Sequence, residues 1–115
     1  MSTRWPFEPL LRDLIATLAR GDYAEAARRT AGERLSAAEI EGAVTDYGRR
    51  LVPAPEGDAL LVDVVGIQDA APPAWSVWAP LWTAEEGRSD LTLQLTVWAQ
   101  PDGGFQAEID GILVP

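Results

Sequence analysis

The spacing of apolar residues changes halfway along the chain, and this change constrains the fold more than any other feature. In the first 50 residues they recur three and four positions apart, as on one face of a helix: Leu10, Leu11, Leu14, Ile15 and Leu18. After Pro53 and Pro55 they alternate every second residue, which is typical of strands. Helices followed by strands predict an α+β domain whose helices pack on one sheet face.

Turn and cap residues divide the pattern into three helices and four strands. Asp22 and Ser36 are suited to cap the second and third helices, and Gly48 to end the third. The chain of 115 residues is expected to form a single domain, with a helical half at 1–50 and a sheet at 59–114. The predicted strands, in an antiparallel and curved sheet, cover residues 59–69, 75–83, 90–100 and 105–114.

The last two strands allow a prediction of register. Pro101, Asp102 and Gly103 suit a three-residue hairpin loop that ends on a left-handed glycine. Closing Gln100 against Gly104 predicts these pairs on the helix-covered face: Val97–Ala107, Leu95–Ile109 and Leu91–Leu113. The other face then pairs Trp98–Gln106, Thr96–Glu108 and Gln94–Asp110.

Missing residue types exclude several kinds of chemistry. The chain has no cysteine and no histidine, so it has no disulfide, thiolate nucleophile or serine-histidine triad. No P-loop or dinucleotide-binding fingerprint is present. The N-terminal residues lack the apolar run of a signal peptide, and no segment approaches membrane-spanning length. We expect a cytoplasmic protein without cofactor or metal that acts as an interaction protein rather than as an enzyme.

Charge is distributed unequally between the two halves. Residues 1–50 contain eight arginines and eight acids, whereas residues 51–115 contain one arginine, Arg88, and ten acids, a net charge of 1 − 10 = −9. A field of this sign repels nucleic acid and anionic membranes and attracts a basic partner. The alternative is that the acids only keep a small sheet soluble.

Strand alternation also predicts an aromatic surface. Trp75, Val77, Ala79 and Leu81 fall on the helix-covered face, which leaves three tryptophans on the other face with three acids around them: Trp78, Trp82, Trp98, Asp63, Glu108 and Asp110. Tryptophans rimmed by charge are typical of interaction surfaces, so we expect this face to bind a basic partner or a second copy. The alternative is that other segments cover the indoles as core.

A polar segment connects the second and third strands. It contains four charged residues and two hydroxyls: Thr83, Glu85, Glu86, Arg88, Ser89 and Asp90. Loops on rigid scaffolds often carry function. In the alternative, these residues only build the turn, through a glycine, local hydrogen bonds and charge neutralisation. Their spacing matches no calcium-binding loop, so no metal is predicted.

Asp46 and Tyr47 provide a different hypothesis. An aspartate base beside a tyrosine donor, in a pocket between helices and sheet, could transfer protons on a small apolar ligand. The alternative is that Tyr47 is a core residue with its hydroxyl at the rim.

Three segments together resemble an uncharacterised bacterial family, a domain of unknown function. They are the Leu-Trp-Thr-x-Glu-Glu-Gly-Arg-Ser-Asp-Leu-Thr-Leu run at 81–93, the Asp-Tyr-Gly helix end at 46–48 and the closing Ile-Asp-Gly-Ile-Leu-Val at 109–114. The resemblance covers nearly the whole chain and implies no activity. The order of elements also resembles cystatin-like and NTF2-like folds. The acidic sheet half and the tryptophans beside it lead us to expect an immunity-type or regulatory protein that covers a basic surface. The alternative is a small-ligand enzyme or carrier with an NTF2-like pocket between helices and sheet.

Overall fold

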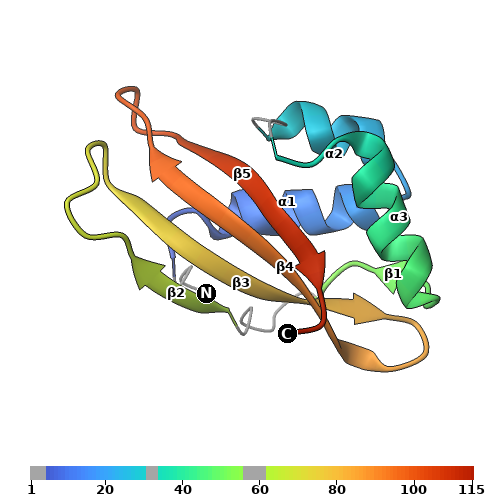
Figure 1. The fold of residues 1–115 in the computed structure, drawn as a ribbon. Coiled ribbons are helices and arrows are strands. Elements are labelled where there is room, and N and C mark those ends of the chain that lie inside the picture. The colour runs from blue at the N-terminus through green and yellow to red at the C-terminus, as the bar shows by residue number, and fades with distance from the viewer. Residues whose placement is uncertain (1–4, 31–33, 56–61) are drawn as a thin grey trace.

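Three helices on one side of an antiparallel sheet make up the architecture (Figure 1). The computed structural model describes residues 5–30, 34–55 and 62–115. The helices and strands are α1 (Glu8–Ala19), α2 (Tyr23–Arg29), α3 (Ala37–Tyr47), β1 (Leu51–Val52), β2 (Asp63–Gly66), β3 (Ala74–Thr83), β4 (Gly87–Ala99) and β5 (Phe105–Leu113). The predicted α+β class is confirmed.

Local capping explains where α2 and α3 begin and where α3 ends. The Asp22 side chain accepts a hydrogen bond from the Glu25 backbone N–H at 3.2 Å. Ser36 and Glu39 form the complete capping box at the start of α3. Gly48 adopts φ +75° at its end, which glycine tolerates without strain. These interactions are local, which is why the sequence was sufficient to place the helices.

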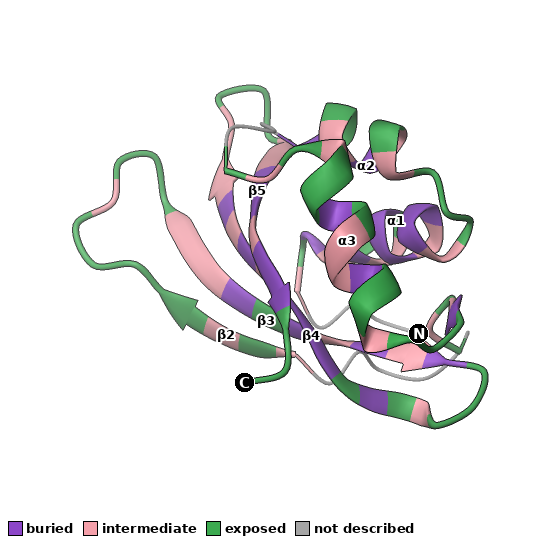
Figure 2. Cartoon of the chain, turned by 45° about the vertical axis from the view of Figure 1, so that its right-hand side comes forward, coloured by how far each residue is buried: buried purple, intermediate pink, exposed green. Residues whose placement is uncertain are grey.

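The sheet has five strands, so the prediction of four is wrong. Its order is β1-β3-β4-β5, and β2 also pairs with β3. The additional strand β1 consists of two residues, Leu51 and Val52, which pair with Thr83 and Trp82. Of the predicted strand at 59–69, residues 63–66 form β2, and residues 59–61 lie outside the described residues. The sheet is neither closed nor strongly curled, which differs from the expected curvature (Figures 1 and 2).

The hairpin register agrees with the prediction only near its turn. Gln100 closes against Gly104 and Gly103 has φ +89°, so the predicted loop is confirmed. Four predicted pairs also hold: Val97–Ala107, Leu95–Ile109, Trp98–Gln106 and Thr96–Glu108. Beyond them a bulge inserts one residue on β5, so Gln94 pairs with Gly111 and Thr92 with Leu113. The predicted pairs Gln94–Asp110 and Leu91–Leu113 are wrong for this reason.

Apolar residues from all three helices and the inner sheet face form the core (Figure 2). Leu11 and Ile40 from the helices, and Val77, Leu93 and Leu95 from the sheet, are completely buried. At one end of the core, Phe7 packs on Trp75 and Phe105 at ring-centroid distances of 5.4 and 5.8 Å. None of the helices in the described part is long and apolar enough to cross a membrane. None of the three described helices covers the opposite sheet face, and we call this face the open face (Figure 1).

Candidate interaction surface

The three predicted tryptophans lie on the open face. Trp78 stands between Val77 and Ala79, which are buried against the helices, and is itself 41% exposed. Trp82 and Trp98 are half-buried: Trp82 stands between buried Leu81 and Thr83, and Trp98 follows buried Val97. The three indoles do not stack on one another, because positions 78 and 82 are four residues apart, roughly 13 Å along a strand. They mark three separate points of the face.

Exposed aliphatic residues lie beside Trp78 on β2. Val65 is 66% exposed and pairs with Ser76, and Ile67 is 43% exposed and donates its backbone N–H to the Ala74 carbonyl at 2.9 Å. Paired residues point to the same side of a sheet, so both aliphatic side chains share the open face with Trp78. Together they form an exposed apolar patch on neighbouring strands, which the prediction did not include.

The three predicted rim acids differ in their surroundings. Asp63 pairs with Trp78 across the strands and is exposed. Glu108, in contrast, is 7% exposed and has an interaction partner. Asp110 lies in the β5 bulge, where its carboxylate forms an ion pair with Arg34 and accepts a hydrogen bond from the Thr96 hydroxyl at 2.8 Å. Only Asp63 of the three therefore offers a free carboxylate to a partner.

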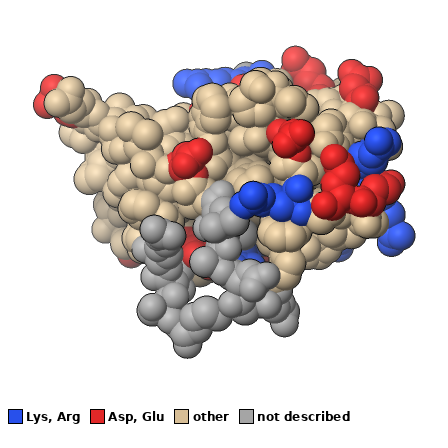
Figure 3. Space-filling model, turned by 90° about the horizontal axis from the view of Figure 1, so that it is seen from below, with Lys and Arg blue, Asp and Glu red and all other residues tan. Residues whose placement is uncertain are grey.

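Negative charge is nevertheless concentrated on the sheet half. The helical half neutralises itself through ion pairs between Arg12 and Glu8 and between Arg28 and Glu25, and through two formed by Arg29, with Glu25 and Asp13. Asp63, Asp69 and Asp90 on the sheet half are exposed and form no ion pair with a described residue. Seen from below, part of the surface carries few charged side chains, and next to it acidic and basic side chains cluster (Figure 3).

The polar segment between β3 and β4 builds a docked turn. The Thr83 hydroxyl accepts the Glu86 backbone N–H at 3.0 Å and donates to the Glu86 carboxylate at 3.2 Å. Glu86 also accepts the Tyr47 hydroxyl at 2.9 Å, and Glu85 accepts the Arg50 backbone N–H at 3.0 Å. These bonds fasten the hairpin to the end of α3. Arg88 and Asp90 are exposed beyond the turn, and Gly87 has φ +74°.

Ser89 holds a second irregularity in the sheet. The β3–β4 register shifts between Pro80 and Trp82. There the Ser89 hydroxyl donates to the Leu81 carbonyl at 2.8 Å and accepts the Leu91 backbone N–H at 3.1 Å. Ser89 is 7% exposed, and its hydroxyl bonds two backbone groups at Leu81 and Leu91, positions that have no partner in the shifted β3–β4 register.

Asp46 and Tyr47 both line an open pocket of about 390 Å³ between α3 and the end of β5. The remaining lining is apolar: Ala43, Leu91, Ile112, Leu113 and Val114. Partial burial and the hydrogen bond to Glu86 raise the pKa of Tyr47 above its ordinary value of 10.0. The Tyr47 hydroxyl therefore donates its proton to the hydrogen bond with Glu86. In the described part of the chain, no group of three acids could hold a metal ion.

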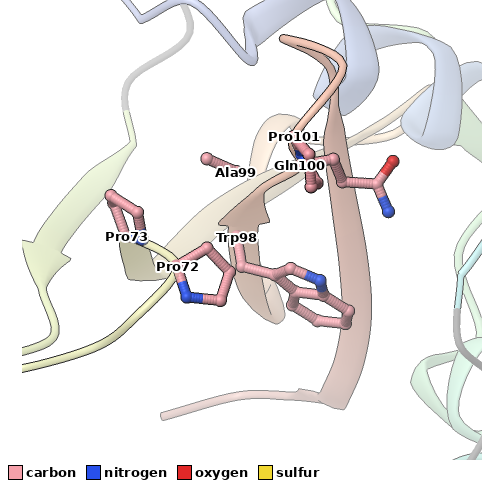
Figure 4. A pocket seen from close by; sticks show the side chains of 6 residues that line it. All are labelled: Pro72, Pro73, Trp98, Ala99, Gln100 and Pro101. Atoms are coloured by element: carbon pink, nitrogen blue, oxygen red, sulfur yellow. The ribbon is translucent and has the colours of Figure 1, made fainter.

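Sequence reasoning missed an apolar groove at the other end of the sheet (Figure 4). Its volume is about 400 Å³, and it lies between the β2–β3 loop and the β4–β5 turn. Pro72 and Pro73 come from the loop, and Trp98 and Pro101 from β4 and the turn. The Ala99 backbone N–H donates to the Pro73 carbonyl at 2.8 Å, which holds the two segments together. The sequence signal for this groove was a proline in each of the two connections, close to Trp98.

Comparison with known proteins identifies a family without an assigned activity. No curated protein and no solved structure matches the chain. A family model, described as a domain of unknown function (DUF7668), matches residues 15–115. The match includes the 81–93 run, the α3 end and the last strand, on which the predicted resemblance rested. The chain therefore belongs to the DUF7668 family of domains of unknown function.

Proposed function

We propose that this domain is a non-enzymatic interaction protein of the immunity or regulatory type, and that its open face binds a protein partner with a basic surface. The observation that carries the proposal is the apolar patch of Trp78, Val65 and Ile67. Exposed large apolar side chains on neighbouring strands are unusual for a surface that contacts only water. Tryptophan is also the residue most enriched among binding hot spots.

Charge favours a basic partner over a second copy. The net charge is −9. The arginines of α1 and α2 form ion pairs with glutamates of the same helices, so the negative excess lies on the sheet half. Two copies meeting at their open faces would bring two such fields together, whereas a basic surface would be attracted. Asp63, exposed beside Trp78, is placed to meet a cation at the rim of the patch.

Affinity capture with matched variants tests the proposal. Wild type, Trp78→Ala, Asp63→Asn and Glu41→Gln would each be immobilised, Glu41 being an exposed acid of α3 far from the face. We expect the wild type and Glu41→Gln to capture basic proteins. Trp78→Ala should bind the same proteins at least about tenfold more weakly. Binding to the wild type should also weaken at about 0.5 M salt. Circular dichroism would establish that each variant is folded.

Three outcomes would contradict the proposal. The first is capture of only acidic or neutral proteins, and the second is capture that does not depend on Trp78. The third is a Trp78-dependent dimer in sedimentation experiments, strengthened by salt, which would assign the face to a second copy.

The α3–β5 pocket favours a second candidate function, a small-ligand enzyme or carrier. Its volume of about 390 Å³ falls in the range of small-molecule sites, and Asp46 and Tyr47 are its polar residues. Such a site agrees with the NTF2-like and cystatin-like resemblance of the element order. An apolar fluorescent probe that binds wild type but not Ala43→Trp, which narrows the pocket, would support this candidate. Equal binding to both would contradict it.

A further inference from the structure

The groove beside Trp98 has mostly apolar walls, and each of the two connections that form it also carries an aspartate. Pro72, Pro73 and Pro101 line it together with the Trp98 indole (Figure 4). The β2–β3 loop that supplies Pro72 also carries Asp69, and the turn that supplies Pro101 also carries Asp102. Both aspartates are exposed, and neither forms an ion pair with a described residue.

No arginine of the surrounding strands competes for these carboxylates. Residues 66–80 and 94–115 contain no basic residue. Arg88, the single arginine of the sheet half, pairs with Trp82 at the opposite end of the β3–β4 hairpin. Residues 66–80 and 94–115, which supply the groove walls and the two aspartates, therefore contribute no basic residue at this end of the sheet.

We propose that the groove holds an arginine side chain of the basic partner, an inference that rests on the function proposed above and names the group that the partner inserts. The methylene stem packs on the prolines and the guanidinium lies over the Trp98 indole, a combination that arginine favours. Asp69 and Asp102 then balance its charge from the two sides. The indole N–H of Trp98 makes no hydrogen bond with a described residue and remains available to a peptide carbonyl.

Two peptides of equal shape and different charge test this inference. One is acetyl-triarginine amide, and the other replaces each arginine with uncharged citrulline. Binding would be followed by the indole N–H signals of the five tryptophans in nitrogen-15 NMR spectra, with Trp98→Phe identifying the Trp98 signal. We expect triarginine to shift the Trp98 signal and tricitrulline to bind at least about fivefold more weakly.

Asparagine variants of the two aspartates remove charge without changing the loops. Asp102 accepts the Gly104 backbone N–H at 2.8 Å, which an asparagine oxygen can also accept. Asp69 has φ +58°, a conformation that asparagine tolerates. The double variant Asp69→Asn/Asp102→Asn should bind triarginine about fivefold more weakly, while Glu41→Gln should bind like wild type.

Equal binding of the two peptides, or unchanged binding by the double asparagine variant, would overturn the inference. So would shifts confined to Trp78. That last result would leave the proposed function standing, because it would place the cation on the patch instead of in the groove. If triarginine binds the groove as expected while no basic protein depends on Trp78, the groove assignment stands and the open-face proposal fails.

Discussion

Removing the Ser89 hydroxyl tests whether the polar segment between β3 and β4 is structural. The hydroxyl satisfies the Leu81 carbonyl and the Leu91 N–H, at 2.8 and 3.1 Å. Leu81 is completely buried and Leu91 is 2% exposed, so water has little access to the groups left behind. Ser89→Ala would therefore leave one buried donor and one buried acceptor without partners.

The expected cost follows from these two groups. A buried backbone group deprived of its partner costs about 1–3 kcal/mol, partly offset because the alanine no longer buries a hydroxyl. We expect Ser89→Ala to lower the free energy of unfolding by about 2–4 kcal/mol, a large part of the stability of a domain of this size. Urea denaturation followed by circular dichroism would show a lower midpoint with an unchanged slope.

Ser76→Ala provides the matched control. Ser76 is half-buried on β3, and its hydroxyl makes no hydrogen bond with any described residue. The same change in side chain there should alter stability by less than about 0.5 kcal/mol. Equal, small losses for both variants would refute the structural role. Loss of partner binding in Ser89→Ala at unchanged stability would assign the segment to function instead.

Three further predictions concern the helices and the core. Because the pKa of Tyr47 is raised, its contribution to stability is present below the ordinary value of 10.0 and is lost as the pH rises above that value. Tyr47→Phe should therefore lose less stability than the wild type between neutral and alkaline pH, as measured by urea denaturation. The backbone N–H and hydroxyl of Ser36 lower the pKa of Glu39, so its contribution is present above the ordinary value of 4.5 and lost as the pH falls below it. The stability difference between wild type and Glu39→Gln should therefore shrink on acidification, and a constant difference would contradict this. Leu95→Ala, at a completely buried position of β4, should cost about 2–5 kcal/mol in urea denaturation, and a loss below about 1 kcal/mol would contradict the assigned core.

Elements set by neighbouring residues were predictable from the sequence. The Ser36–Glu39 capping box and the left-handed Gly48 are interactions within one turn of chain, and the structure contains both. The loop closed by Gln100 and Gly104 is equally local, and four residue pairs next to it were predicted correctly. Period-two alternation also placed Trp78 on the open face, because β3 is regular from Ala74 to Pro80.

Features that depend on distant residues were not predictable. Strand β1 exists because Leu51 and Val52 reach the end of β3, some thirty residues later in the chain (Leu51 pairs with Thr83). The bulge at Asp110 adds a residue that no period-two count detects, and every pair beyond it shifts. Arg34, the partner of Asp110, lies 76 residues earlier in the sequence. Because Arg34 neutralises Asp110, the acidic rim of the open face is smaller than predicted.

The run at 81–93 lies within the residues that match the family, and most of its polar side chains form hydrogen bonds within the fold. Thr83, Glu85 and Glu86 fasten the hairpin to α3, and Ser89 completes the irregular ladder. A segment whose polar atoms already bind other parts of the same chain has little left to offer a partner. The open face and the Trp98 groove are different, because the exposed apolar patch contacts solvent, and Asp63, Asp69 and Asp102 form no ion pair with a described residue. Specificity for a partner is therefore to be sought in the side chains that the fold of this chain does not use.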